Sequence, residues 1–391
     1  MSPKRDDHPD KWEYQQHTRA KHDVLHYYLK IWTSIVSNEN YPLRIFDCFA
    51  GRGGYYEAEG VDPKKLDNIS TDTKIPGSPQ IIMNAVSEHS DKFESAECYF
   101  LEPNRNNRND LETNLEKTET PDNVNPYVKD AKFPDDIPSL IRRSGGKEGF
   151  AFFFIDPYNI KYLDYVTITD IASFSNWSGG FECLITLMTG QLIRWQDSRA
   201  HQKGYENLFG TPNWQNELEK YQPEQLETRE AEYYCQRLME SGPEYTLAYM
   251  TTEGESRKLK YHLVFTTNSE DGLEYMRESM YHQGTNYALA FAPHRAEASF
   301  KQTGIDQFTP SGKLSEKDLA KSHLLARFEG ETMGFDEVVS GAIAERPYAE
   351  SRRPDYRQYL KDLHAEGEVE IPQRDDNALK EDWLIHFPGG S

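Results

Sequence analysis

The stretch Leu43-Arg44-Ile45-Phe46-Asp47-Cys48-Phe49-Ala50-Gly51-Arg52-Gly53-Gly54 decides the fold. Its first half is an apolar run that predicts a buried strand, and its second half is a glycine-rich turn. Because glycine permits positive φ and close approach to a ligand, we expect Gly51, Gly53 and Gly54 to adopt such conformations. Asp47 falls near the carboxyl end of the strand, where open α/β sheets place their ligand crevice. By itself, the spacing G-x-G-G is also met in turns that merely link a strand to a helix.

Three further apolar runs end in acidic residues, namely Glu102, Asp130 and Asp156. The last run, residues 149–156, is long and apolar enough to be a central strand of a parallel sheet. In a doubly wound sheet, an acid at the end of the second strand hydrogen-bonds ribose hydroxyls. Four successive strands that end in acids resemble the class I S-adenosylmethionine (AdoMet) methyltransferase pattern. We therefore expect a Rossmann-like α/β fold.

The composition bounds the class of protein. A chain of 391 residues is long enough for two domains and a sizeable core. Its net charge of −21 argues against a wholly basic nucleic-acid-binding protein, although it leaves room for a local basic groove. No apolar run approaches the length of about 18 residues that a membrane span needs, and no signal peptide is visible. We expect a cytoplasmic protein that does not enter a membrane.

The four cysteines are scattered along the chain at positions 48, 98, 183 and 235. They form no C-x-x-C pair, and no histidine stands at ligand spacing from them. Three of them fall in predicted buried strands, so core packing is the better interpretation. We expect neither a disulfide nor a metal site.

A helix is predicted over residues 11–37, ahead of the first strand. Lys21 and His22 lie near the start of its apolar face. For Lys21 we favour a position at the mouth of the cofactor site, near the cofactor's carboxylate or a substrate phosphate. For His22 we favour packing in the core.

A polar insertion at residues 57–74 separates the glycine turn from Gly77-Ser78-Pro79. Ser78 is expected to cap a helix over residues 79–89, with Pro79 in its first turn, where the missing N–H costs nothing. This second turn and its N–H groups can also face the same crevice as the glycine turn.

The second half of the chain predicts an insertion, a hairpin and a C-terminal domain. A helix at 165–174 and a strand at 182–188 come first, followed by a helical insertion at about 190–240, two strands at 245–251 and 261–267, and a helix at 272–282. The two later strands have the pattern of an antiparallel hairpin that closes such a sheet.

Three short helices over residues 315–328, 334–344 and 355–366, followed by a terminal hairpin, predict a winged helix-turn-helix. Arg352, Arg353, Arg357 and Lys361 stand on or just before its third helix. Binding to duplex nucleic acid and binding to protein are equally open for this domain.

The predicted organisation therefore has three parts. They are an N-terminal helix at 1–40 that packs on the core, a methyltransferase-like Rossmann domain at 41–300, and a winged helix domain at 313–391. A polar, turn-rich linker at about 300–312 precedes the last part.

In order and spacing, these motifs resemble the three-Cys-motif partner (TcmP) proteins. The matching parts are the Lys21 helix with Tyr28-Leu29 and Trp32, Asp47-x-Phe49-Ala50-Gly51-x-Gly53, Gly77-Ser78-Pro79, Phe100-Leu101-Glu102, Asp156-Pro157-Tyr158 and Tyr261-His262-Leu263-Val264-Phe265. The resemblance implies a methyltransferase-like Rossmann fold and a partner protein with a three-cysteine cluster motif, of the kind that holds an iron–sulfur cluster in radical-AdoMet enzymes. The Ala-Gly turn, Gly-Ser-Pro and Asp-Pro also look like those of ribosomal-RNA adenine-N6 methyltransferases.

The resemblance also implies which residues form the site. AdoMet would be bound by Lys21, Asp47, Ala50, Gly51, Gly53, Ser78, Glu102 and Asp130. Among these, Glu102 would contact the ribose, Asp130 the adenine amine and Asp47 the methionine end.

The residues implied as catalytic are Asp156, Pro157 and Tyr158. In amino methyltransferases with Asp/Asn-Pro-Pro-Tyr/Phe, the acid or amide and the first prolyl carbonyl bind the amine, while the aromatic ring stacks on the flipped base. Here the sequence is Asp156-Pro157-Tyr158-Asn159, so one proline is missing and the aromatic residue stands one position earlier.

The sequence leaves three candidate functions to compare. The leading one is an AdoMet-dependent methyltransferase acting on a nucleic-acid base, with adenine N6 of RNA or DNA as the preferred acceptor. The second is a catalytically idle scaffold that docks the cysteine-cluster partner, in a mobile-element or phage-defence module. A dinucleotide oxidoreductase is disfavoured because the first loop lacks G-x-G-x-x-G.

Overall fold

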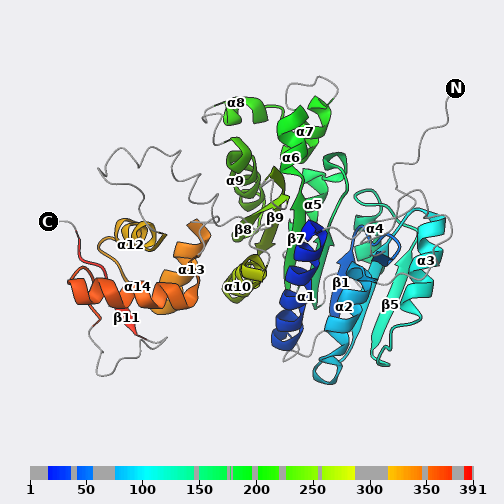
Figure 1. Cartoon of the computed structure of the whole chain (residues 1–391), viewed down its shortest axis with the longest axis horizontal. Coiled ribbons are helices and arrows are strands. Elements are labelled where there is room, and N and C mark those ends of the chain that lie inside the picture. Colours follow the sequence, from blue (N-terminus) through cyan, green and yellow to red (C-terminus); the bar gives the residue numbers. More distant parts are fainter. Residues whose placement is uncertain are drawn as a thin grey trace. The chain divides into compact units, whose positions relative to one another are not determined.

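The computed structural model describes residues 16–36, 42–55, 75–144, 149–173, 177, 179–195, 201–219, 226–253, 258–286, 316–345, 351–371 and 383–389. The chain divides into two compact units, residues 1–186 and residues 187–391 (Figure 1). The predicted insertion at 57–74 and the predicted linker at 300–312 lie outside the described residues. The three-part division predicted from the sequence therefore stays a prediction.

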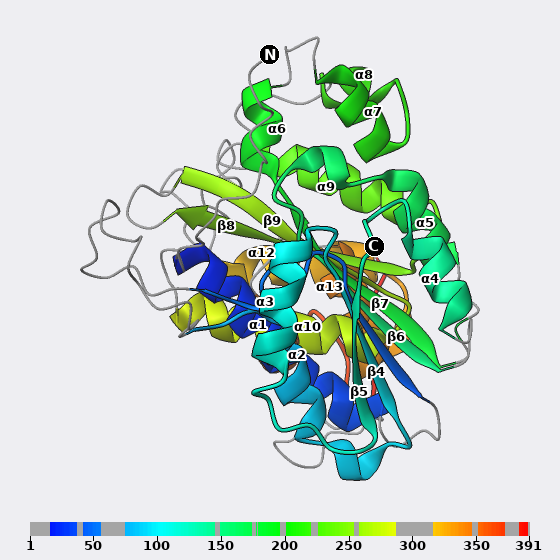
Figure 2. The ribbon, with the colours of Figure 1, turned by 90° about the vertical axis from the view of Figure 1, so that its right-hand side faces the viewer.

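The first unit is built on parallel strands in the order β5-β4-β1-β6-β7 (Figure 2). Their bounds are β1 Leu43–Asp47, β4 Ala96–Leu101, β5 Val124–Lys129, β6 Phe150–Ile155 and β7 Gly180–Leu187. In register, Asp47 at the end of β1 is level with Phe100 on β4 and Phe154 on β6. The predicted strands are confirmed, and the fold is mixed α/β with a mostly parallel sheet.

Helices cover both faces of these strands. The helices of this unit are α1 Gln16–Val36, α2 Ser78–Ser87, α3 Arg105–Leu115, α4 Ile137–Arg143 and α5 Tyr165–Ser173. In Figure 2, α1, α2 and α3 lie on one face, whereas α4 and α5 lie on the other. Successive residues of β6 point to opposite faces: Phe152 meets Trp32 of α1 at 5.8 Å between ring centroids, and Phe153 meets Trp177 at 6.4 Å. Alternation along a strand that is buried from Ala151 to Ile155 thus fills both halves of the core.

Two local predictions are wrong. Ser78 does not cap the following helix: α2 starts at Ser78 itself, Gly77 takes the N-cap position, and no side chain caps it. Gly54 does not have positive φ, because it enters the short strand β2 (Gly54–Tyr55), which pairs with β3 (Ile75–Pro76). Gly51 and Gly53 do have positive φ, at 60° and 79°.

The second unit contains the predicted helical insertion and hairpin. Its elements up to α10 are α6 Thr189–Trp195, α7 Gln202–Phe209, α8 Trp214–Leu218, α9 Leu226–Met239, β8 Tyr245–Glu253, β9 Lys258–Thr267 and α10 Glu270–Asn286. The strands β8 and β9 pair antiparallel, as the sequence predicts.

The rest of this unit has three helices and a small sheet. They are α12 Glu316–Arg327, β10 Thr332–Gly334, α13 Phe335–Glu345, α14 Arg353–Glu366 and β11 Leu384–His386, with β10 antiparallel to β11. The three helices are where the sequence places them, whereas a winged helix-turn-helix stays a prediction.

Basic residues near the start of α14 are engaged within the second unit. Arg353 Nη1 donates to both carboxylate oxygens of Glu274 on α10, at 2.9 and 2.8 Å. Arg352 Nη1 donates to Glu278 Oε1 at 3.1 Å, and Arg277 Nε donates to the Ser351 carbonyl at 2.7 Å. Arg352 and Arg353, two of the basic residues expected at the third helix, therefore join α14 to α10.

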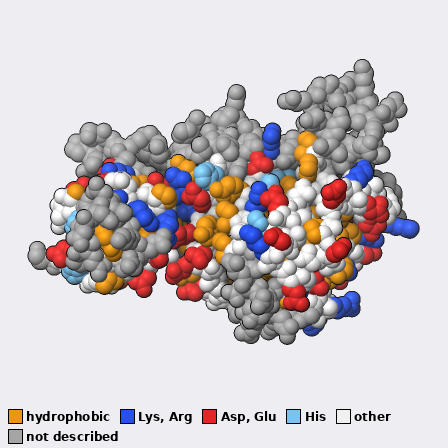
Figure 3. All heavy atoms as spheres, turned by 90° about the horizontal axis from the view of Figure 1, so that it is seen from below, with side chains coloured by type: hydrophobic (Ala, Val, Ile, Leu, Met, Phe, Trp, Pro, Cys, Tyr) orange, Lys and Arg blue, Asp and Glu red, His pale blue; other side chains and the backbone are white. Residues whose placement is uncertain are grey.

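On the face that Figure 3 shows, acidic side chains are interspersed with Lys and Arg. Although the chain has a net charge of −21, the acidic side chains on this face do not form one continuous patch. Among the described residues, no helix is long and apolar enough to cross a membrane.

The glycine turn gives a stability prediction with a matched control. Gly53 and Gly330 have nearly the same φ, +79° and +78°, but a Cβ at Gly53 would lie 2.8 Å from Leu111 Cδ1, whereas one at Gly330 would meet nothing within 4 Å. Gly330→Ala should cost about 1–2 kcal/mol for the left-handed backbone alone. Gly53→Ala should cost about 1–3 kcal/mol more because of the overlap. Urea unfolding followed by circular dichroism measures both, and equal costs would contradict the close contact.

Candidate functional site

The strand order places a topological switch point between β1 and β6. Beyond β1 the sheet continues to β4 and β5, and beyond β6 it continues to β7. Ligands of open α/β sheets bind outside the carboxyl ends of the strands at such a point. Asp47 is the last residue of β1, and Asp156 directly follows β6. The structure thus brings these two predicted site residues to the same edge.

An ion pair joins helix α1 to this edge. Lys21 Nζ donates to Asp156 Oδ2, and the two side chains are only 8% and 19% exposed. Asp156 Oδ1 accepts no hydrogen bond from the residues that the structure describes. The sequence places Lys21 at the mouth of the cofactor site; in the structure its partner is a carboxylate of the chain itself.

His22 is packed, as favoured from the sequence. Its ring is buried and lies 5.4 Å from the ring of Tyr55. Burial first, and then the neighbouring Lys21, lowers the pKa of His22 to about 3. The imidazole is therefore neutral at physiological pH and adds no charge beside Lys21.

Asp47 is a fully buried acid held by two donors. Its Oδ2 accepts a hydrogen bond from Ser78 Oγ at 2.7 Å, and its Oδ1 accepts one from the Phe49 N–H at 3.1 Å. Burial raises the pKa of Asp47 to about 7; the bonds from Ser78 and Phe49 and the charge of Lys21 oppose this rise, and Asp156 adds to it. Asp47 can therefore gain or lose a proton near neutral pH.

The glycine turn is clamped between β4 and the start of α2. The Ala50 N–H donates to the Leu101 carbonyl at 3.1 Å, and the Gly77 N–H donates to the Gly53 carbonyl at 2.9 Å. A Cβ at Gly77 would lie 2.7 Å from the Gly53 carbonyl carbon, so only glycine allows this approach. The contact brings Ser78 to Asp47, and the two turns predicted to share one crevice are adjacent.

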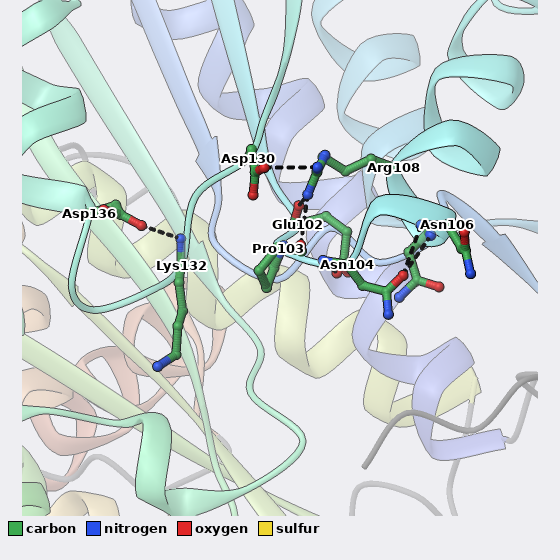
Figure 4. Close-up of polar contacts among 9 residues, drawn as sticks. Glu102, Pro103, Asn104, Asn106, Arg108, Asp130, Lys132 and Asp136 are labelled. Carbon is green, nitrogen blue, oxygen red and sulfur yellow. Dashed lines mark hydrogen bonds and ion pairs between the residues drawn. The ribbon is translucent and has the colours of Figure 1, made fainter. Parts of the chain in front are cut away.

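Glu102 and Asp130 follow the next two strands (Figure 4). Glu102 is 3% exposed, and its Oε1 accepts a hydrogen bond from the Asn104 N–H at 2.7 Å. The Asp130 side chain is 72% exposed, and its Oδ2 accepts from Arg108 Nη2 at 2.9 Å. These acids thus differ: one is buried in a tight turn, and the other reaches solvent from the end of β5.

Aromatic rings extend the site beyond the residues predicted from the sequence. Pro157 is buried, whereas Tyr158 is 38% exposed. The ring centroids of Tyr158 and Tyr162 are 4.9 Å apart, and the two hydroxyls form a hydrogen bond. The ring centroid of Tyr162 lies 6.1 Å from that of Phe49. Sequence reasoning missed Tyr162 and gave Phe49 no role. The available signal was Asn159, whose Oδ1 accepts from the Lys161 N–H at 3.0 Å and starts the turn that carries Tyr162.

Among the residues that the structure describes, no three or more His, Cys, Asp or Glu side chains lie close enough together to hold a metal ion. The four cysteines are free and buried. The carboxylates at the switch point can accept hydrogen bonds from hydroxyl or amino groups of an organic ligand, and the turn N–H groups can donate to its acceptors.

No family model and no curated protein matches the chain. Among solved structures, it aligns with Trm1 from Pyrococcus horikoshii in complex with S-adenosyl-L-methionine at 9% identity, covering 89% of this chain and 93% of that one, with a TM-score of 0.37. Protein LPL1258 from Legionella pneumophila aligns at 16% identity over 65% of this chain and 85% of that one, also with a TM-score of 0.37. A spermidine synthase in complex with the transition-state analogue AdoDATO aligns at 7% identity over 73% and 75%, with a TM-score of 0.33. At these values the likenesses carry no weight for activity or substrate.

The raised pKa of Asp47 predicts a pH-dependent stability. The pKa of Asp47 is about 7 in the folded protein and 3.8 ordinarily. The stabilisation that the fold gains from binding the acid's proton is therefore fully present below pH 3.8 and is lost as pH rises through 7. The amide in the variant Asp47→Asn cannot ionise, so the variant does not lose this stabilisation. Between pH 4 and 8, the unfolding free energy of wild type should fall relative to that of Asp47→Asn by about 2–4 kcal/mol.

Urea midpoints at several pH values test this prediction. Ser78→Ala removes a hydrogen bond that favours the ionised acid, so the loss of stability should move to higher pH in that variant. Parallel stability curves for wild type and Asp47→Asn would rule out a titrating Asp47.

Proposed function

We propose that the chain is an AdoMet-dependent methyltransferase acting in the cytoplasm on the amino group of a nucleic-acid base, with adenine N6 as the preferred acceptor. The observation that carries the proposal is the pair of acids at the switch point between β1 and β6. One acid, Asp47, precedes a clamped glycine turn, and the other, Asp156, begins Asp-Pro-Tyr. The motif order, which resembles the TcmP proteins, supports the same function and suggests a cysteine-cluster partner.

The residues around the switch point fit a nucleoside with an amino-acid arm. We assign Glu102 to the ribose hydroxyls, Asp130 to the adenine amine and Asp47 to the methionine end. Ala50, Gly51, Gly53 and Ser78 would line the arm. A buried acid with a pKa near 7 suits an ammonium group, since that charge would favour its ionised form.

When bound, AdoMet supplies a methyl group already activated by its sulfonium. The chain therefore has to position the accepting amine rather than activate the donor. Asp156 would accept a hydrogen bond from that amine, the Pro157 carbonyl would accept another, and Tyr158 would stack on the base. Lys21 would hold the Asp156 side chain in place.

The Lys21–Asp156 ion pair also favours a second candidate. A carboxylate held by a lysine from α1 already has a structural task, because it fixes that helix to the sheet edge. On this second proposal the chain is a catalytically idle scaffold that docks the cysteine-cluster partner in a mobile-element or phage-defence module.

The cofactor assignment predicts a loss of affinity in Glu102→Gln. Glutamine retains an acceptor for the Asn104 N–H but loses the charge that strengthens hydrogen bonds from ribose. Calorimetry with S-adenosylhomocysteine should show binding weakened by about 1.5–3 kcal/mol. Glu112→Gln, at an exposed position on α3, is the matched control and should bind like wild type. Unchanged affinity in Glu102→Gln would remove Glu102 from the site.

Asp156→Asn separates the enzyme from the scaffold. If Asp156 orients the amine, this variant should bind S-adenosylhomocysteine like wild type but transfer methyl groups from radiolabelled AdoMet to RNA or DNA about 100-fold more slowly or worse. An equal rate in the variant would exclude Asp156 as a catalytic residue. Wild-type protein that binds the cofactor but methylates neither RNA nor DNA, even with its partner, would leave the scaffold function.

A further inference from the structure

Arg108 lies near the start of α3 and connects the ends of two neighbouring strands (Figure 4). Its Nη1 donates to the main-chain carbonyls of Glu102 at 2.8 Å and Pro103 at 2.7 Å. Its Nη2 donates to Asp130 Oδ2 at 2.9 Å. One guanidinium thus binds the turn after β4 and the acid after β5, and neither the sequence motifs nor the proposed roles make use of it.

Arg108 is held in place by the turn after β4, whereas its bond to Asp130 lies at the protein surface. Its side chain is only 16% exposed, and two of its hydrogen bonds go to carbonyls in the turn that begins at the buried Glu102. Asp130, by contrast, is 72% exposed, and an exposed ion pair stabilises a fold little. The bond to Asp130 therefore sets where that carboxylate points more than how stable the fold is.

Asp130 has no other hydrogen-bond or ion-pair partner for its side chain among the residues that the structure describes. Of the two lysines next to it along the chain, Lys129 holds its Nζ over the rings of Tyr99 and Tyr127, 5.8 and 4.8 Å from their centroids. Lys132 bonds to Asp136 through its N–H at 2.8 Å and to Asp135 through Nζ at 3.2 Å. Arg108 takes Oδ2 and leaves Oδ1 as an acceptor. A carboxylate fixed in this way can accept from an amine that lies over the strand ends.

We propose that Arg108 is a positioning residue that makes the cofactor site selective for a 6-aminopurine, by orienting Asp130 to accept from the exocyclic amine. The inference rests on the proposed function, because it takes the nucleoside to lie between Glu102 and Asp130. A 6-oxopurine offers an acceptor where the 6-aminopurine offers a donor, so an oriented carboxylate opposes it. A site built to accept from an N–H rejects an analogue that lacks it.

The experiment compares two ligands, S-adenosylhomocysteine and S-inosylhomocysteine, which differ at the purine 6-position. Wild-type full-length protein should bind the amino form at least tenfold more tightly, which corresponds to about 1.4 kcal/mol. Asp130→Asn should bring the two affinities within about threefold, because an amide can also donate to the oxo group. Arg108→Gln should reduce the preference to a similar extent.

Two further variants keep the outcome interpretable. Arg105→Gln removes a positive charge from an exposed position on the same helix and should leave the preference unchanged. Arg108→Lys retains the charge but lacks the planar fork that serves three acceptors, so its preference should lie between those of wild type and Arg108→Gln. It also provides a second variant should Arg108→Gln fail to fold.

The ratio of the two affinities separates positioning from simple support of the fold. If Arg108→Gln and Arg108→Lys weaken both ligands equally, Arg108 only supports the turn and the inference is wrong. A wild-type protein that binds both ligands equally overturns the inference but leaves an AdoMet-class site in place. If wild type binds neither ligand, the proposed function fails, and the inference fails with it.

Discussion

The carboxylate of Asp47 is fully buried, and the geometry of the glycine turn follows from the need to satisfy it. A buried acid without donors is costly, so the chain must bring hydrogen bonds to it. One comes from the N–H of Phe49, two residues along, and the other comes from Ser78 at the start of α2. For Ser78 to reach Asp47, the backbone of Gly77 must lie against that of Gly53, where a side chain would not fit. Gly53 and Gly77 are thus required by packing whether or not a ligand binds.

A second constraint is the charge balance among Lys21, Asp47 and Asp156. Lys21 is almost buried, and removing either member of a buried ion pair is costly because it leaves the other charge unpaired. On the proposed function, an amine at Asp156 would share the carboxylate with Lys21 and bond to Oδ1, because Lys21 binds Oδ2. The charge of the same lysine opposes the burial-driven rise in the pKa of Asp47 and adds to the burial-driven fall in the pKa of His22. Helix α1 therefore contributes a charged side chain to the carboxyl edge of the sheet and does more than cover it.

Local patterns were sufficient for the elements of the fold but not for the contacts within the site. An apolar run such as Phe150–Ile155 can hardly be anything but a buried strand, and an acid after it must emerge at the sheet edge. The sequence misassigned Ser78 because a serine before a proline has the signature of a helix cap, while its actual partner lies 31 positions away. Arg108 and Tyr162 were missed for the same reason: their roles depend on Asp130 and Tyr158, which only the fold and a short turn bring near.

The Asp156-Pro157-Tyr158-Asn159 segment departs from the double-proline motif and still presents aromatic rings. With one proline missing, Tyr158 stands a position early, and its neighbour Asn159 turns the chain by accepting from the Lys161 N–H. That turn places Tyr162 beside Tyr158 with their hydroxyls bonded, and Tyr162 in turn contacts Phe49 from the glycine turn. A base needs a flat apolar face more than a particular residue, because every base can stack on an aromatic ring. On the proposed function, Tyr158 would offer its ring to the base, and Tyr162, tilted by 57° against it, would hold that ring in place.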